Sequence, residues 1–69
     1  MRKAVYPLWE DLMVEKQLSF TDLSKAIPIM SPQAWRRRFV GITEMTVSEA
    51  SCLANFLQVP INDLTKRRD

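Results

Sequence analysis

Hydrophobic residues recur at every third or fourth position along most of the chain, and polar residues separate the groups they form. The first group comprises Leu8, Trp9, Leu12 and Met13. This spacing is typical of one face of an amphipathic helix. Pro7 suits the first turn of such a helix, because the N–H that proline lacks has no partner there. The pattern predicts a first helix from about residue 5 to residue 16.

A capping signal introduces the second group. Ser19 stands three residues before Asp22, the spacing of a capping box. The apolar stripe that follows consists of Phe20, Leu23 and Ile27. Pro28 ends the segment, because the residue before a proline is driven out of the helical region. We expect a short second helix over about residues 19–27.

The third helix has clear boundaries at both ends. Ser31 is a preferred N-cap and Pro32 a preferred first helical residue. Gly41 is the natural stop, since glycine tolerates the left-handed conformation that commonly follows a helix. These signals predict a helix over about residues 32–40.

Two further helices complete the chain. Thr46 and Glu49 form a second capping box. One face of the following helix carries Val47, Ala50, Leu53, Ala54 and Leu57. Pro60 begins a last short helix through Leu64, and a basic tail occupies residues 66–69. The expected fold is all-α: a single domain, residues 1–69, built as a compact bundle of about five short helices.

The composition of this small domain of 69 residues argues against several classes of function. The chain has no His, the commonest general base and metal ligand, and its one Cys cannot form an internal disulfide. No apolar run approaches the roughly 18 residues of a membrane helix. Glu10 and Asp11 soon follow the basic start, so we expect no signal peptide. We expect a protein of a reducing cytoplasm that is not an enzyme, with no metal, cofactor, membrane partner or small-molecule substrate.

The small positive charge is concentrated in one segment. Ten Lys and Arg against eight Asp and Glu give a formal charge of +2. Residues 1–30 carry four bases and four acids, and residues 46–69 carry three of each. The whole surplus lies in residues 31–45, where three arginines face one glutamate. The third helix is therefore the candidate for binding an anionic partner.

The third helix has two different sides when residues are placed about 100° apart. One side carries Pro32, Gln33, Arg36, Arg37 and Val40, and the other carries Ala34, Trp35, Arg38 and Phe39. We expect the second group to face the core, so Arg38 snorkels or pairs with an acid. Gln pairs bidentately with adenine and Arg with guanine, which suits the first group to the major groove of DNA. The alternative is that the arginines form only a solvated face.

Three motifs, in order, make residues 8–65 resemble a known family. They are residues 18–24 (LSFTDLS), residues 31–35 (SPQAW) closed by Gly41, and residues 53–64 (LANFLQVPINDL). They are similar to the second helix, the recognition helix and the closing segment of the Cro/CI-type phage repressors, the lambda-repressor-like (XRE) helix-turn-helix domains. The chain departs from the family pattern in having Pro28 where glycine is usual, a turn one residue longer near Met30, and Arg38 at a position where an apolar residue is common.

The resemblance implies a set of DNA contacts. It places Ser31, Pro32, Gln33 and Arg37 at base edges, with Gln33 and Arg37 the best candidates for sequence recognition. It also implies phosphate contacts at Arg36, Ser19, Phe20, Thr43 and Thr46. Ser19 has a purely local alternative role as a helix cap. Trp9 and Trp35, whose rings could stack on bases, lie on stripes that face the core, where we expect them.

Apolar residues also lie outside the main stripe of the fourth helix. Cys52 and Phe56 are four residues apart on the side opposite its leucines, and Ile61 follows in the segment that similar repressors use for pairing. Either the last helix covers these residues, or they form a protein interface. The resemblance implies that the partner is a second copy, giving a dimer on a pseudo-palindromic operator.

The sequence thus favours a phage or prophage transcriptional regulator that binds an operator in the cytoplasm of a bacterial host, at the nucleoid, and blocks polymerase. The alternative is a helix-turn-helix-shaped modulator or antirepressor that acts by binding another repressor through Cys52, Phe56 and Ile61. The modest charge of +2 keeps this alternative open, because DNA-binding domains are often more basic.

Overall fold

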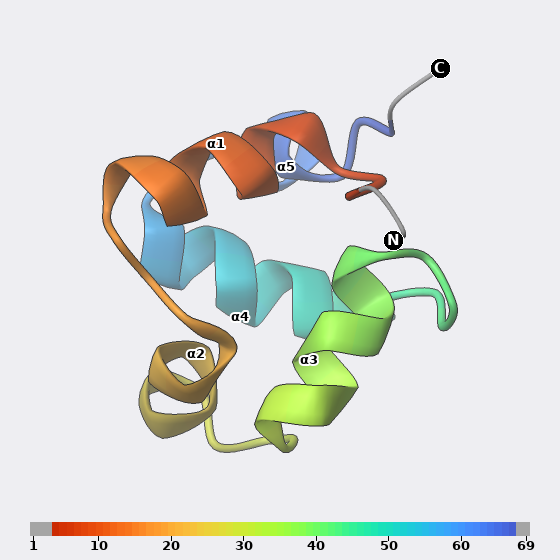
Figure 1. Ribbon diagram of the computed structural model, residues 1–69. Helices are drawn as coiled ribbons and strands as arrows, with labels where there is room; N and C mark the ends of the chain where they lie inside the picture. The colour runs from red at the N-terminus through yellow and green to blue at the C-terminus, as the bar shows by residue number, and fades with distance from the viewer. Residues whose placement is uncertain (1–3, 68–69) are drawn as a thin grey trace.

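A computed structural model describes residues 4–67, and within them the chain forms five α-helices and no strand (Figure 1). The helices are α1 (Pro7–Glu15), α2 (Phe20–Ala26), α3 (Pro32–Phe39), α4 (Val47–Leu57) and α5 (Ile61–Leu64). The prediction of a small all-α bundle is confirmed. Residues 1–3, and residues 68–69 of the expected basic tail, lie outside the described part of the chain.

Helix α4 crosses the middle of the molecule (Figure 1). Helices α1 and α5 pack together above it in this view, and α2 and α3 pack together below it. The buried positions of α4 are those of the predicted stripe: Ala50, Leu53, Ala54 and Leu57. Val47, at the start of that stripe, is 79 % exposed. With 11 residues, α4 is the longest helix of residues 4–67 and is too short to cross a bilayer.

Aromatic rings join α1, α2 and α3. Trp9 of α1 and Trp35 of α3 are both fully buried, with ring centroids 6.0 Å apart and planes at 84°. Trp9 also meets Phe39 edge-on at 5.0 Å, and Phe39 meets Phe20 of α2 at 5.2 Å. Near-perpendicular rings bring the positive edge of one ring to the negative face of the next. The expectation that both tryptophans belong to the core is confirmed.

The indole N–H groups of this cluster have no hydrogen-bond acceptor. Nε1 of Trp9 and Nε1 of Trp35 are both buried without a partner among the described residues. Of the other expected core residues, Leu23, Ile27, Leu53, Leu57 and Leu64 are buried, and Leu12 packs against them partly exposed.

All three predicted side-chain caps are present. Ser19 and Asp22 exchange hydrogen bonds at the start of α2, and Thr46 and Glu49 do so at the start of α4. The hydroxyl of Ser31 accepts a hydrogen bond from the Ala34 N–H at 3.2 Å. Each cap satisfies an N–H that the first turn of a helix leaves free. The polar signals in the sequence therefore place these three helix starts to within a residue.

The first helix begins two residues later than the periodicity predicts. Val5 lies at a bend and Tyr6 has extended backbone angles, and the Val5 N–H donates to the carbonyl of Phe39 at 3.0 Å. This bond ties the chain's first described residues to the end of α3. Gly41 follows α3 with a φ of +83°, and a Cβ at this position would lie 2.8 Å from Cγ1 of Val5. Both the backbone conformation and the close approach therefore require glycine.

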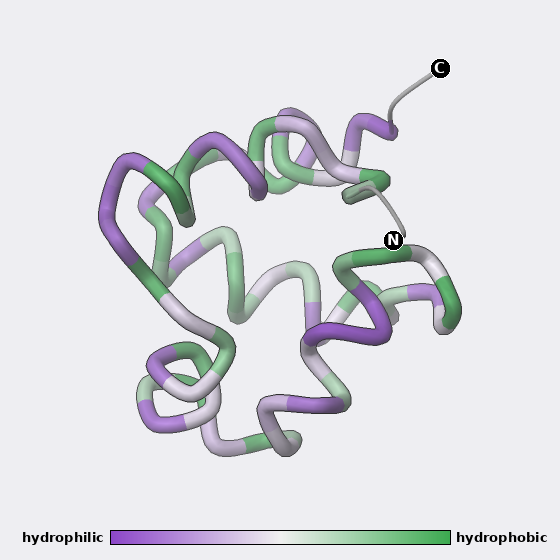
Figure 2. The backbone as a smooth tube through the Cα atoms, viewed as in Figure 1, coloured by the Kyte–Doolittle hydropathy of each residue, from purple (hydrophilic) through white to green (hydrophobic). Residues whose placement is uncertain are grey.

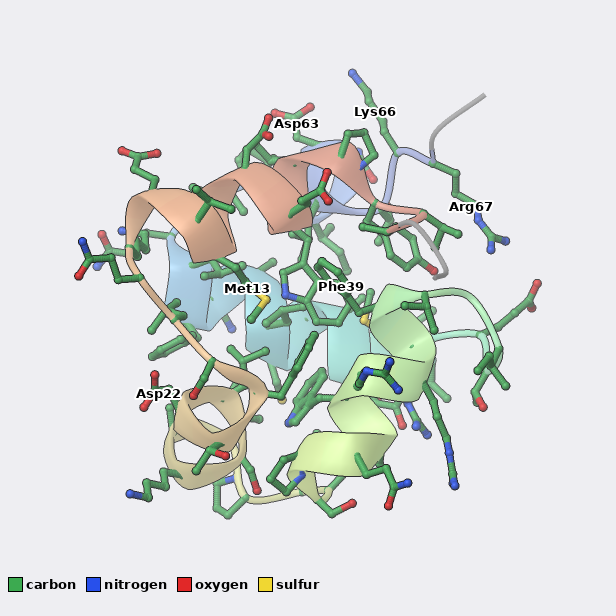
Figure 3. All side chains as sticks on the ribbon, in the orientation of Figure 1. Met13, Asp22, Phe39, Asp63, Lys66 and Arg67 are labelled. Atoms are coloured by element: carbon green, nitrogen blue, oxygen red, sulfur yellow. The ribbon has the colours of Figure 1, made fainter. Side chains whose placement is uncertain are left out.

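The basic residues after α5 make contacts of their own. Lys66 pairs with Asp63 at 3.6 Å, and the two side chains project together at one end of the molecule in Figure 3. The guanidinium of Arg67 lies 5.6 Å from the ring centre of Tyr6 and 3.6 Å from the Glu44 carboxylate. Arg67 thus contacts both the segment before α1 and the loop that follows α3.

Gly41→Ala should lower the free energy of unfolding by about 1–2 kcal/mol, the cost of a left-handed conformation at a residue with a Cβ. Displacement of Val5 adds to this cost. Urea denaturation followed by far-ultraviolet circular dichroism measures the change. Ser48→Ala, at an exposed position of α4, is the control and should change stability by less than about 0.5 kcal/mol. Equal stability of the two variants would contradict the role given to Gly41.

Candidate nucleic-acid interface

The start of α3 sets the position of the residues predicted to contact bases. Ser31 has extended backbone angles and caps the helix, and Pro32 occupies its first turn. The Ser31 hydroxyl accepts a hydrogen bond from Ala34 and keeps its own proton available for an outside acceptor. Ser31 is exposed and Pro32 half-buried. The two residues therefore begin the helix and also border its outer surface.

The outward side of α3 carries three long polar side chains. Gln33, Arg36 and Arg37 are all exposed, and none has a side-chain hydrogen bond or ion pair within residues 4–67. The arginine-rich stretch of α3 is purple in Figure 2, followed by the green residues that end the helix. These three side chains keep their full donor capacity for an external partner. The structure thus brings together the two best predicted base contacts and the predicted phosphate contact Arg36.

Arg38, on the inward side of α3, is held by an acid. Its Nε donates to Oε1 of Glu49 at 2.8 Å, and its Nη2 faces Oε2 at 3.3 Å. Its Nη1 donates to the carbonyl of Ala34, one turn earlier in α3, at 3.0 Å. The two side chains are only 17 % and 16 % exposed. The expectation that Arg38 pairs with an acid is confirmed.

Glu49 is the residue that sequence reasoning missed as part of this site. We expected it only as the cap of α4, and it does accept the Thr46 N–H at 3.0 Å. It also forms an ion pair with Arg38, which joins α4 to α3. The hydrogen bond from Arg38 is the largest cause that holds the pKa of Glu49 below its ordinary value, against the raising effect of burial. The signal was an unpaired inward arginine and an acid at a helix start, but their pairing depends on the tertiary fold.

The turn between α2 and α3 forms without glycine. Ile27 has φ −127° and ψ 81°, outside the helical region, as Pro28 requires. The Ser24 hydroxyl donates to the carbonyl of Met30 at 3.0 Å and closes the turn. No residue of the turn has a positive φ. The proline-containing turn is therefore closed by a side-chain hydrogen bond and needs no left-handed residue.

The predicted phosphate contacts at α2 have local roles in the structure. The Ser19 N–H donates to the carboxylate of Asp22 at 2.9 Å, and this bond is the largest cause that lowers the pKa of Asp22. A phosphate at this position would meet the Asp22 carboxylate, which Figure 3 shows beside the start of α2. Phe20 directs its ring toward Phe39. Ser19 thus caps α2 and the ring of Phe20 packs against Phe39, and the phosphate contacts predicted through the N–H groups at this helix start stay a prediction.

The loop after α3 carries the remaining predicted phosphate contacts. Thr43 is half-buried, and its N–H donates to the carbonyl of Arg37 at 3.3 Å. Thr46 is exposed, and its N–H is taken by Glu49. Both hydroxyl groups retain a proton to donate. Thr46 also shares the Glu49 carboxylate with Arg38, which links this loop to α3.

The structure does not gather the three predicted interface residues into one patch. Cys52 is exposed and Phe56 is 39 % exposed, on the side of α4 away from its buried stripe. Ile61 instead lines a hollow of about 420 Å³ between α4 and α5. The lining of that hollow is Met45, Thr46, Val47, Ala50, Ile61, Asn62 and Thr65. At about 100° per residue, Ala50 and Phe56 lie on different sides of α4, so the helix separates the two surfaces.

Comparison with known proteins gives no match: no family model, no curated protein and no solved structure. The function must therefore be inferred from the chemistry of the outer face of α3. That face combines one amide and two guanidinium groups, all unpaired within residues 4–67 and all on one side of a capped helix. This combination can donate hydrogen bonds to base edges and neutralise phosphates.

The contribution of the Arg38–Glu49 pair should depend on pH. A carboxylate whose pKa is lowered by folding stabilises the protein above its ordinary pKa of 4.5, and this stability is lost as the pH falls through the lowered value. Glu49→Gln keeps the shape of the side chain but removes its titratable carboxyl group. At neutral pH the wild type should exceed this variant in unfolding free energy by about 2 kcal/mol.

That difference should shrink progressively in urea denaturation series below about pH 4.5. Asp22, whose pKa is also lowered, is present in both proteins, so its titration cancels from the comparison. A difference that stays constant across the acidic range would contradict the charge of Glu49 as the source of its contribution.

Proposed function

We propose that this protein is a sequence-specific regulator of transcription that binds double-stranded DNA, a Cro/CI-type repressor that places α3 in the major groove of an operator. Bound there, it would exclude polymerase by occupying the site. The observation that carries the proposal is the unpaired, exposed set of Gln33, Arg36 and Arg37 on the outer face of α3. We further propose that two copies bind an operator with two-fold symmetry.

The chemistry of the outer face supports base recognition. Gln33 lies in the first turn, where an amide can donate to N7 and accept from N6 of adenine. Arg37 lies one turn further along, and its guanidinium fits the O6 and N7 acceptors of guanine. Arg36, beside it, is suited to a phosphate of the groove wall. Arg38 is excluded from this set, because Glu49 holds it inward.

The packing of α2 against α3 also supports the proposal. The aromatic contact of Phe20 with Phe39 and the closed turn after Ile27 hold the two helices as one unit. In helix-turn-helix proteins the second helix of such a unit enters the groove and the first crosses the backbone. The surplus of two positive charges lies in residues 31–45, whose three arginines are all on this second helix, so the charge and the geometry favour the same helix.

A second candidate function rests on the exposed side of α4. Cys52 and Phe56 lie there uncovered by α5, and a small domain seldom exposes an aromatic residue beside other apolar atoms without a partner. On this alternative the protein is a modulator that binds another repressor. The net charge of +2 is compatible with either function.

Gln33→Ala and Arg37→Ala should each cost about 1–3 kcal/mol of binding to a selected site and relax preference at one base position. The site is obtained by repeated selection of a random duplex library with the wild-type protein. Arg36→Ala should weaken binding to all sequences alike and reduce the salt slope of log Kd by about 1. Fluorescence anisotropy with selected and random duplexes measures all three variants.

Lys16→Ala is the matched control, since it removes one exposed cation from the end of α1, away from α3. It should leave the preference for the selected site unchanged. If the library yields no enriched sequence, or if both Gln33→Ala and Arg37→Ala keep full affinity for it, the placement of α3 in the groove is wrong.

Phe56→Asp separates the two candidate functions. A DNA-binding regulator should retain its affinity for a duplex with a single half-site in this variant, because one copy binds that duplex through the outer face of α3 and needs no pairing surface on α4. A modulator should instead lose its complex with its repressor partner, measured by co-purification from host extract. Val14→Asp, at a position 74 % exposed on α1, is the control for adding a charge to the surface. Loss of half-site affinity in Phe56→Asp, with Val14→Asp unaffected, would contradict the α3 interface.

A further inference from the structure

We infer that Arg38 is a positioning residue for the DNA interface: its forked bridge to Glu49 sets the rotation of α3 about its axis and so the direction of Gln33 and Arg37. The inference rests on the proposed function. Arg38 touches no base in this arrangement. It acts through the helix that carries the base contacts.

The apolar contacts of α3 determine which side of the helix faces the core. Trp35 and Phe39 pack edge-on against Trp9, and the burial of their apolar area is itself non-directional. The Arg38 bridge has a specific geometry, because a planar guanidinium donates two hydrogen bonds to the two oxygens of one planar carboxylate. A directional contact thus supplements the non-directional one on the same side of the helix.

Both ends of the bridge are themselves held. Arg38 is tied back to its own helix through the carbonyl of Ala34 at 3.0 Å. Glu49 is tied to the first turn of α4 through the N–H of Thr46 at 3.0 Å, while its own N–H bonds the Thr46 hydroxyl. Helix α4 is fixed in turn by four buried residues. The bridge therefore links α3 to the central helix of the molecule through a chain of short, satisfied contacts.

The rotation of α3 matters because base recognition tolerates little displacement. A helix with its side chains has a radius of about 5–6 Å, so a rotation of about 10° moves an outer atom by about 1 Å. Hydrogen bonds span only about 2.7–3.2 Å, and a shift of that size breaks one bond of a bidentate pair. Arg37 is the direct neighbour of Arg38 in α3, and a rigid helix transmits the same rotation to Gln33.

Arg38 is poorly placed to bind phosphate itself. Three of its N–H groups already have acceptors, and its side chain is largely buried between α3 and α4. A residue in this state contributes little to counterion release on DNA binding. Loss of Arg38 should therefore affect which sequences are bound, and leave the general attraction to DNA unchanged.

The test compares Arg38→Met, which keeps an unbranched apolar stem, with Lys16→Met, which removes one cation from an exposed site. The readouts are the ratio of Kd for random duplex to Kd for the selected duplex, and the salt slope. Arg38→Met should lower the ratio about tenfold, the value of one bidentate base contact, with an unchanged salt slope. Lys16→Met should change neither quantity.

These readouts separate positioning from a structural role. Partial unfolding of a variant weakens binding to both duplexes by the same factor and leaves their ratio unchanged. Arg38→Lys keeps the charge without the fork, and its ratio should also fall. If Arg38→Met is unfolded under binding conditions, Glu49→Gln replaces it, with the same expected loss of ratio.

The outcomes are distinct. A wild-type ratio of unity overturns the proposed function and this inference with it. A wild-type preference that Arg38→Met retains overturns the inference alone, as does a salt slope that falls by about 1, which would make Arg38 a phosphate contact. Full recovery of the ratio in Arg38→Lys also overturns it, because charge without the fork would then suffice.

Discussion

The packing of Trp35 and Phe39 against Trp9 is the contact on which the rest of the structure depends. Eight residues of α3 must bury two aromatic rings on one side, and once they do, the helical repeat directs Gln33, Arg36 and Arg37 to the other. The same rings join α1 and α2 to α3. A small domain with a limited core gains from this concentration of apolar area in a few large side chains. The candidate interface is thus a consequence of how the core is built.

Polar contacts determine where the helices begin and how they are oriented, which apolar packing alone does not specify. Ser19, Ser31 and Thr46 determine where α2, α3 and α4 begin, each through a hydrogen bond to a backbone N–H. The Arg38–Glu49 bridge extends the third of these caps to a neighbouring helix. A largely buried ion pair adds little net stability when compared with an apolar pair, but its geometry is specific. The contribution of these contacts is therefore mainly to the relative placement of the helices.

Local signals in the sequence predicted the fold well because each helix start has its own polar signature. The capping residues and Pro32 located the helices to within one or two residues, and periodicity identified Trp9 and Trp35 as core. The outer face of α3 followed from the same periodicity. The features that the sequence did not predict depend on contacts between residues far apart in the chain. Glu49 as the partner of Arg38, and Ile61 on a different surface from Phe56, are consequences of how α4 and α5 pack, which no local pattern records.

The low net charge bears on how the proposed function would work. Phosphate attraction scales with the number of cations at the interface, and this chain has a surplus of only two, on a single helix. A strongly basic domain obtains most of its affinity from phosphates, whatever the DNA sequence. With little general affinity, a domain of charge +2 must obtain a larger share of its binding from base contacts, which depend on geometry. A bridge that fixes the orientation of α3 therefore has a larger effect here than it would on a more basic surface.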